Sequence, residues 1–292
     1  MKKLLCVPGL FLLTVYISSA CTTFFLNKNG QLFFGRNYDW VSGTGIVCTN
    51  LRSLQKTSLK QEDGNTMSWV SNYGSITFNQ YGKEFPTGGM NEKGLVVELM
   101  WLDATKFPEP DNRPSVNVLQ WIQYQLDQNV TVDEVIATDE IIRINSKGTP
   151  IHYLVADAGG NVATIEFLKG KMVVHKGKEL PFPVLTNSTY DESMQQTNGL
   201  NNKSFQDNSI ERFARACRLV ERFQIHDQAI PAFALYYIVI FCFDFGRKAL
   251  EYIQRSLPRV VFTTNGYTHN DELQPCLRII VGDQLPFVVH FF

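Results

Sequence analysis

The sequence has no excess of either charge, because 27 Lys and Arg residues stand against 28 Asp and Glu residues. A nucleic-acid-binding protein needs a basic surface for the phosphates, so this balance argues against a polynucleotide partner. Removal of residues 1–20 would take away Lys2 and Lys3 and no acidic residue, leaving a net charge of about -3. We therefore expect neither nucleic acid nor another polyanion as a partner.

The sequence also lacks an apolar run of the roughly 20 residues that a membrane-spanning helix needs. Residues 1–3 are basic at Lys2 and Lys3, residues 4–16 are apolar and residues 17–20 are small, which is the pattern of a secretory signal peptide cleaved after Ala20. The other apolar run, Tyr236 to Phe243, is too short to span and favours a buried helix segment. We expect export to the periplasm or beyond, and no transmembrane span.

Zinc-binding and redox spacings are missing as well. No two cysteines form a C-x-x-C pair, and the histidines show no H-E-x-x-H pattern. We therefore expect no metal and no cofactor. One cysteine, Cys6, belongs to the predicted signal peptide, and five remain: Cys21, Cys48, Cys217, Cys242 and Cys276. An odd number leaves at least one free thiol, and the spacing does not say which cysteines pair.

The remaining pattern predicts one α+β domain over residues 21–292, since hydrophobic residues make up 44% of the sequence and no linker or repeat interrupts it. Residues 21–26 and 31–40 predict a hairpin around Asn29-Gly30. A tight turn is expected at 88–94 and a surface loop at 188–208. Further strands are predicted at 46–52, 74–79, 95–101, 152–156, 162–167, 171–175, 259–264, 277–281 and 286–292, and helices at 114–128, 131–144, 210–224 and 229–256.

The hairpin brings Cys21 close to a cation. If Asn29-Gly30 is the turn, Thr23 pairs with Arg36, and Cys21 is a diagonal neighbour of Arg36 on the same face at roughly 7–8 Å. A nearby cation lowers the pKa of a thiol, and the thiolate is the nucleophile. Cleavage before Cys21 would also give it an α-amino group that can act as its base. Asp39 reaches Cys21 only if the strand bends, and would then orient that amine.

A competing interpretation makes Cys21 the lipid attachment site of an exported binding protein. Two features argue against it. Ser18 stands where lipid-attachment signals favour an aliphatic residue, and the chain enters a predicted strand at once instead of a flexible tether. Arg36 and Asp39 would otherwise form only a structural ion pair.

Four motifs in order resemble those of the choloylglycine hydrolase family, which includes penicillin V acylases and conjugated bile salt hydrolases. They are Cys21-Thr22-Thr23, Gly35 to Trp40, Gly89 to Leu95, and Leu185 to Ser188. The resemblance covers roughly residues 21–225. It implies an N-terminal-nucleophile hydrolase with a four-layer αββα sandwich of two antiparallel sheets, a processed N-terminal cysteine, hydrolysis of a non-peptide C–N amide bond in a small acyl amide, and a homo-tetramer.

The resemblance also implies roles for single residues. Cys21 matches the nucleophile, Arg36 the cation beside it, and Asp39 the acid that orients the amine. Asn187 matches the amide that binds the oxyanion, although Asn187-Ser188-Thr189 is also a glycosylation triplet. Arg212 is similar to the family's second active-site arginine.

Two departures from the family pattern affect the substrate and the fold. Trp101 stands where bile salt hydrolases carry an asparagine, so we expect its backbone N–H to serve the oxyanion and its indole to favour a flat aromatic acyl group. A long acyl chain, as in an acyl-homoserine lactone, would suit a narrow apolar slot equally well. Residues 226–292 match no closing strands of the family, which leaves an inactive member as a third interpretation.

Overall fold

The structure is a computed structural model that describes residues 21–28, 31–38, 40, 45–61, 64, 66–197 and 208–222. It also describes the backbone of four strands further along, at 235–241, 261–269, 272–280 and 286–289. The predicted signal peptide and Asp39 lie outside the described residues.

The first sheet contains the N-terminal hairpin. Its strand order is β14-β1-β2-β15-β16-β17-β18. The strands are β1 (Thr22–Lys28), β2 (Gln31–Tyr38), β14 (Val184–Leu185), β15 (Leu235–Phe241), β16 (Val261–His269), β17 (Glu272–Ile280) and β18 (Pro286–Val289). The predicted hairpin register is confirmed, since Lys28 pairs with Gln31 and Thr23 with Arg36.

The second sheet is antiparallel throughout, in the order β13-β12-β11-β8-β7-β6-β3. Its strands are β3 (Ile46–Asn50), β6 (Ser75–Asn79), β7 (Pro86–Asn91), β8 (Val96–Trp101), β11 (Ile151–Ala156), β12 (Val162–Leu168) and β13 (Lys171–Lys176). Every residue of β7 and β11 is buried, so their pattern is continuous instead of alternating. That pattern indicates that both faces of the sheet are covered.

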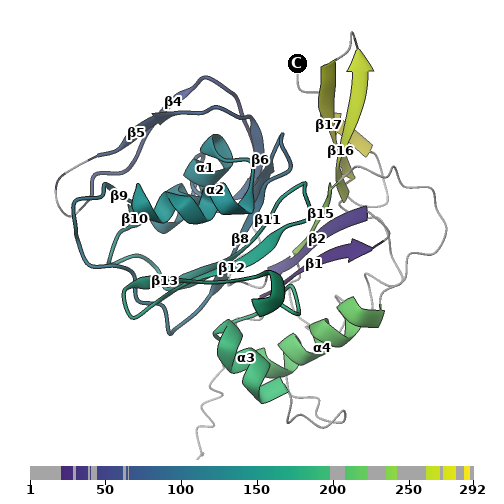
Figure 1. The fold of residues 1–292 in the computed structure, drawn as a ribbon. Helices are drawn as coiled ribbons and strands as arrows, with labels where there is room; N and C mark the ends of the chain where they lie inside the picture. Colours follow the sequence, from purple (N-terminus) through teal and green to yellow (C-terminus); the bar gives the residue numbers. More distant parts are fainter. Residues whose placement is uncertain are drawn as a thin grey trace, which may run out of the picture.

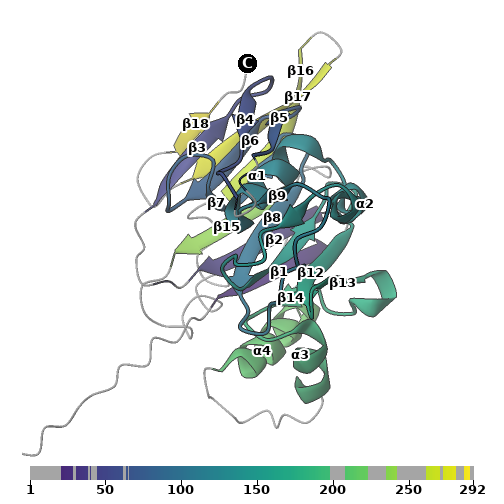
Figure 2. The same ribbon diagram turned by 90° about the vertical axis from the view of Figure 1, so that its left-hand side faces the viewer.

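Helices supply the two outer layers. The helices α1 (Val118–Gln128) and α2 (Val132–Ala137) pack on the second sheet, while α3 (Tyr190–Thr197) and α4 (Ser209–Arg222) pack together, with α4 on β1 and β14 (Figure 1). Figures 1 and 2 show β16 and β17 at the end of the molecule away from α3 and α4. The layers therefore follow the order helix, sheet, sheet, helix.

Short elements complete the chain. Two-stranded pairs form between β4 (Gln55–Thr57) and β5 (Ser68–Val70) and between β9 (Ser115–Val116) and β10 (Arg143–Ile144). Single 3-10 turns span Thr138–Glu140 and Gly177–Glu179.

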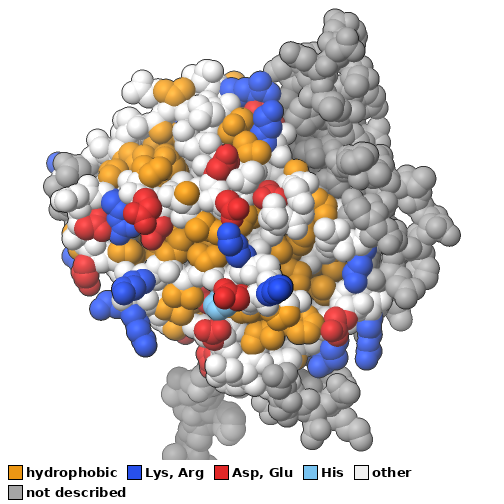
Figure 3. Space-filling model, viewed as in Figure 1, with side chains coloured by type: hydrophobic (Ala, Val, Ile, Leu, Met, Phe, Trp, Pro, Cys, Tyr) orange, Lys and Arg blue, Asp and Glu red, His pale blue; other side chains and the backbone are white. Residues whose placement is uncertain are grey.

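On the face shown in Figure 3, acidic and basic side chains are interspersed, as the balanced charge predicts. None of the helices that the structure describes has the length and apolar character needed to cross a bilayer.

Several sequence-based assignments were wrong. The helix predicted over 229–256 contains β15, which pairs in parallel with β2 in a sheet expected to be antiparallel throughout. The loop predicted at 188–208 contains α3, and the turn predicted at 88–94 begins inside β7. The helix predicted over 131–144 ends at Ala137, and β10 follows it. In each case pairing or burial against a distant segment outweighs local preference.

Candidate active site

A cavity of about 510 Å³ lies beside Cys21, the residue immediately before β1. Its described lining contains aromatic, aliphatic and uncharged polar side chains and no charged one: Cys21, Tyr38, Trp40, Leu59, Tyr81, Phe85, Thr87, Leu99, Trp101, Asn117, Val118, Leu119, Thr149 and Ile151. Such a lining suits an uncharged, largely apolar group.

Arg212 links Cys21 to Asn187, and the three residues are far apart in the sequence. Arg212, from α4, donates one hydrogen bond through Nη1 to the Cys21 carbonyl oxygen at 2.7 Å. Its Nη2 donates to Oδ1 of Asn187 at 2.8 Å. Cys21 and Arg212 are 2% and 5% exposed, so the bond between them is shielded from water, while the bond to Asn187 is partly buried. The arginine therefore ties the first residue of the predicted mature chain to Asn187, the second residue after β14.

Asn187 is held through both its backbone and its side chain. Its backbone N–H donates to Oγ of Ser209 at 2.8 Å, and its Nδ2 donates to the Trp101 carbonyl at 2.9 Å. Because Arg212 donates to Oδ1, the N–H groups of the amide are directed away from the arginine. An amide carries two N–H hydrogens, so one is left after the bond to Trp101.

The backbone of Trp101 faces this amide for a reason of register. Leu102 donates to the Pro150 carbonyl, and Trp101 lies opposite Ile151. In an antiparallel pair, residues that bond to the partner strand alternate with residues that do not. Since Leu102 bonds to the residue just before β11, the N–H and the C=O of Trp101 both point away from β11. The carbonyl meets Asn187 there, and the Trp101 N–H has the same direction.

Two indoles form one wall of the cavity. The rings of Trp40 and Trp101 lie 5.8 Å apart between centroids, with 32° between their planes. Trp101 Nε1 donates to Oδ1 of Asp103 at 2.5 Å, which fixes the rotation of its ring. Tyr38 lies 6.5 Å from Trp40 in a stacked arrangement. The resulting wall is aromatic, and the sequence analysis did not select Trp40 as part of it.

Arg36 crosses the sandwich from β2 to the second sheet. Its Nη1 donates to the Thr87 carbonyl at 2.8 Å and to the carboxylate of Glu98 on β8. Its guanidinium carbon lies 4.1 Å from the centre of the Tyr38 ring, which lines the cavity with Cys21. The hairpin register places Arg36 on the same face as Cys21, as predicted. Asp39 lies outside the described residues, and its predicted role stays a prediction.

Glu98 is a buried carboxylate that the sequence analysis missed. It is 0% exposed, and Gly88 lies opposite it in the register. A Cβ at position 88 would come within 2.0 Å of a Glu98 carboxyl oxygen, so glycine makes room for this side chain. Burial raises the pKa of Glu98 from 4.5 to about 8, against the opposing effect of Arg36. A lone acidic residue in the apolar strand Val96–Trp101 was the available signal.

Comparisons with known proteins identify the family of this chain. The profile of the choloylglycine hydrolase family, linear amide C–N hydrolases, matches residues 21–223. The chain is 30% identical over 218 residues to a penicillin V acylase of Pectobacterium atrosepticum. That match covers 66% of this chain and 56% of the relative, so the chain spans little more than half the relative's length.

Two solved structures have a similar fold. Penicillin V acylase from Agrobacterium tumefaciens gives a TM-score of 0.62 at 22% identity, covering 92% of this chain and 84% of that chain. A mutant of conjugated bile acid hydrolase from Clostridium perfringens gives 0.57 at 20% identity, covering 69% and 72%. These likenesses confirm the predicted N-terminal-nucleophile hydrolase fold. Because the family profile matches more than half of this chain, the chain belongs to the choloylglycine hydrolase family of linear amide C–N hydrolases.

Proposed function

We propose that the mature protein is an exported amidase that uses Cys21 as an N-terminal nucleophile to cleave acyl amides. The observation that carries the proposal is the link from Arg212 to both Cys21, which lines the cavity, and Asn187, through two hydrogen bonds. A nucleophile and an oxyanion donor held by one buried cation form an arrangement suited to acyl transfer.

The reaction begins after cleavage following Ala20, which frees the α-amino group of Cys21. The thiol sulfur forms a bond to the substrate carbonyl carbon, and the thiol proton passes to the α-amine. The carbonyl oxygen becomes an oxyanion, which accepts hydrogen bonds from Nδ2 of Asn187 and the backbone N–H of Trp101. The C–N bond then breaks, and the departing amine takes the proton. Water attacks the thioester in the same way and releases the acid.

The other site residues support these steps. Arg36 favours the thiolate of Cys21 through its positive charge, and Asp39 orients the α-amine. Arg212 holds Asn187 so that its N–H groups, not its carbonyl oxygen, are available to the oxyanion. The same two-sided bonding of the Asn187 amide argues against its use as a glycosylation site.

For the substrate, we propose a flat aromatic acyl group of the penicillin V kind. The Trp40–Trp101 wall offers stacking worth roughly 0.5–1.5 kcal/mol beyond area burial. The uncharged lining supports an uncharged acyl group but does not separate an aromatic group from the acyl chain of a homoserine lactone. We expect kcat/KM for penicillin V at least about tenfold above that for a glycine-conjugated bile salt, a difference of about 1.4 kcal/mol.

The mass of the mature N-terminus is the first test. A chain that starts at unmodified Cys21 supports the proposal, whereas a diacylated Cys21 has no amine to act as base and supports the lipid-anchored binding protein. We also propose export and assembly into a homo-tetramer, which cell fractionation and the mass of the purified protein in solution test.

Two variants test the chemistry. Cys21→Ser should keep the fold and lose most amidase activity, since a hydroxyl is far less acidic than a thiol. One residue added before Cys21 should also abolish turnover, because it converts the amine into an amide. Full turnover in either variant would refute the role assigned to Cys21. Absence of turnover in a parent protein with free Cys21 would favour the inactive family member.

A further inference from the structure

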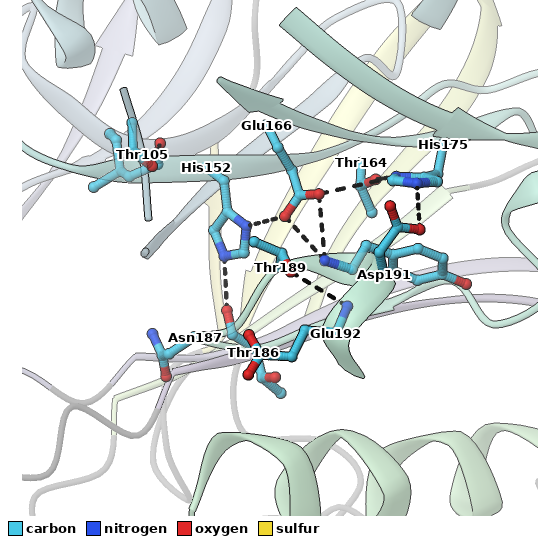
Figure 4. Close-up of polar contacts among 12 residues, drawn as sticks. Thr105, His152, Thr164, Glu166, His175, Thr186, Asn187, Thr189, Asp191 and Glu192 are labelled. Atoms are coloured by element: carbon cyan, nitrogen blue, oxygen red, sulfur yellow. Dashed lines mark hydrogen bonds and ion pairs between the residues drawn. The ribbon is translucent and has the colours of Figure 1, made fainter. Parts of the chain in front are cut away.

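A buried histidine and glutamate lie directly behind the oxyanion amide. His152 on β11 and Glu166 on β12 are both 0% exposed, and the register of the two strands places them opposite each other. His152 Nδ1 lies 3.0 Å from Oε1 of Glu166, and Nε2 lies 2.8 Å from the carbonyl oxygen of Thr186 (Figure 4). Neither residue contributes to the proposed chemistry described above.

The partners determine where the protons lie. A carbonyl oxygen only accepts hydrogen bonds, so His152 Nε2 carries a hydrogen and donates it to Thr186. The contact between Nδ1 and the Glu166 oxygen then needs one further proton between them, on one atom or the other. The backbone N–H of Tyr190 donates to the Glu166 carboxyl at 3.1 and 3.3 Å. Glu166 is thus anchored on β12 and on the first turn of α3, and His152 is anchored on Glu166.

The Thr186 carbonyl belongs to the peptide unit that leads into Asn187. The other end of the same unit, the Asn187 N–H, donates to Oγ of Ser209 on α4 at 2.8 Å. The peptide plane is therefore held at both its polar ends, by His152 from the second sheet and by Ser209 from the outer helix. Fixing this plane fixes the direction in which the Asn187 side chain leaves the backbone.

We propose that His152, held by Glu166, is the positioning residue that aims the oxyanion-binding amide of Asn187. This inference rests on the proposed amidase function. An oxyanion donor acts only when its N–H lies within hydrogen-bond distance of the developing charge, and a displacement of about 1 Å at such a group can cost a hundredfold in rate. His152 acts on the rate through Thr186 and touches neither the substrate nor Cys21.

Two substitutions test the contributions of the two ring nitrogens of His152 separately. Glutamine carries a terminal N–H at the reach of Nε2 and keeps the bond to Thr186, while asparagine carries its N–H at the reach of Nδ1 and keeps only the contact with Glu166. His152→Asn should lower kcat for penicillin V at least about tenfold with KM within about threefold, and His152→Gln should keep kcat within about threefold of the parent. Both variants bury a polar amide, so their effects on stability are comparable.

His175 offers a matched control. It also faces Glu166, with Nδ1 3.9 Å from Oε2, but its Nε2 contacts Oδ1 of Asp191 at 3.0 Å instead of the Thr186 carbonyl (Figure 4). His175→Asn should leave kcat within about twofold of the parent. A rate loss that merely followed disturbance of Glu166 would appear in this variant as well.

Two further readouts separate positioning from a general structural role. Phenoxyacetaldehyde places its oxygen at the oxyanion position when the Cys21 thiol adds to it, so its affinity should fall in His152→Asn by the same factor as kcat/KM. Phenoxyacetate, which lacks that oxyanion, should bind as in the parent. The rate at which iodoacetamide labels Cys21 should also remain unchanged.

Three results would overturn the inference: His152→Asn with the parental kcat, an equal loss in His152→Asn and His152→Gln, or an equal loss in His175→Asn. If the parent is active, such a result removes this inference alone and leaves the amidase proposal intact. A parent with free Cys21 that hydrolyses no acyl amide would instead remove the amidase proposal, and this inference with it.

Discussion

The buried pair of Arg36 and Glu98 predicts an unusual dependence of stability on pH, and Glu98→Gln tests it. Glutamine has the same shape, fits the space opposite Gly88 and can still accept a hydrogen bond from Arg36. It does not titrate. Comparison of the parent with Glu98→Gln therefore isolates the contribution of one proton.

The sign follows from the direction of the pKa shift. Burial raises the pKa of Glu98 from 4.5 to about 8 in the folded protein, so the folded state binds this proton more tightly than the unfolded chain does. The group stabilises the fold fully below the unfolded value of 4.5, and this stabilisation is lost as the pH rises through about 8. Between those values the free energy of unfolding of the parent falls by about 1.4 kcal/mol per pH unit relative to Glu98→Gln. The whole interval corresponds to a difference on the order of 5 kcal/mol.

Urea unfolding of both proteins at about pH 5, 6, 7 and 8 measures the difference between their free energies of unfolding. We expect the advantage of the parent over Glu98→Gln to shrink steadily with rising pH. A difference that stays constant across the series would show that Glu98 titrates outside this window and would refute the reasoning.

The same variant bears on the reactivity of Cys21, because a neutral residue at position 98 leaves the charge of Arg36 uncompensated. Iodoacetamide labelling of Cys21 should be equal in the two proteins near pH 6 and faster in Glu98→Gln near pH 9.

Three further substitutions test single roles in the site. Asn187→Ala should lower kcat for penicillin V by about 10²- to 10³-fold without slowing iodoacetamide labelling of Cys21, and a rate within about twofold of the parent would exclude Asn187 as an oxyanion donor. Arg36→Ala should raise the pH at which iodoacetamide labels Cys21, since the thiolate loses its cation; an unchanged labelling profile would make Arg36 structural. Trp101→Ala should reduce the preference for penicillin V over glycine-conjugated bile salt by up to about tenfold in kcat/KM, and an unchanged ratio would assign selection to other residues of the cavity.

The N-terminal hairpin could be predicted from the sequence because its determinants are local. Asn29-Gly30 predicts a two-residue turn, and such a turn determines which residues pair, so the register of Thr23 with Arg36 followed directly. The partner of Arg36 could not be predicted from the sequence in this way. Glu98 is 62 residues away on the other sheet, and only the packing of the two sheets brings the two side chains together.

The errors have a similar origin. The apolar run around β15 has no polar residues to reveal a period of 2 or 3.6, and its pairing with β2 decides in favour of a strand. The polar segment that forms α3 has few apolar residues to indicate a helix. Burial of Tyr190 beside Phe213, with the Glu192 N–H donating to Oγ1 of Thr189, stabilises that helix in the fold.

The described site contacts bear on whether this chain is an active member of its family. Cys21, Trp101, Asn187 and Arg212 are held by β1, β8, the end of β14 and α4, and all of them precede residue 223, where the family match ends. Among the described side chains, the hydrogen bonds that aim Asn187 likewise come from His152, Ser209 and Arg212. The segment beyond the family match contributes to the first sheet through the pairing of β15 with β2, but supplies none of these contacts. The pairing links this segment to the site through β2, which carries Arg36, so a protein in which the segment fails to support β2 should show the iodoacetamide labelling profile of Arg36→Ala.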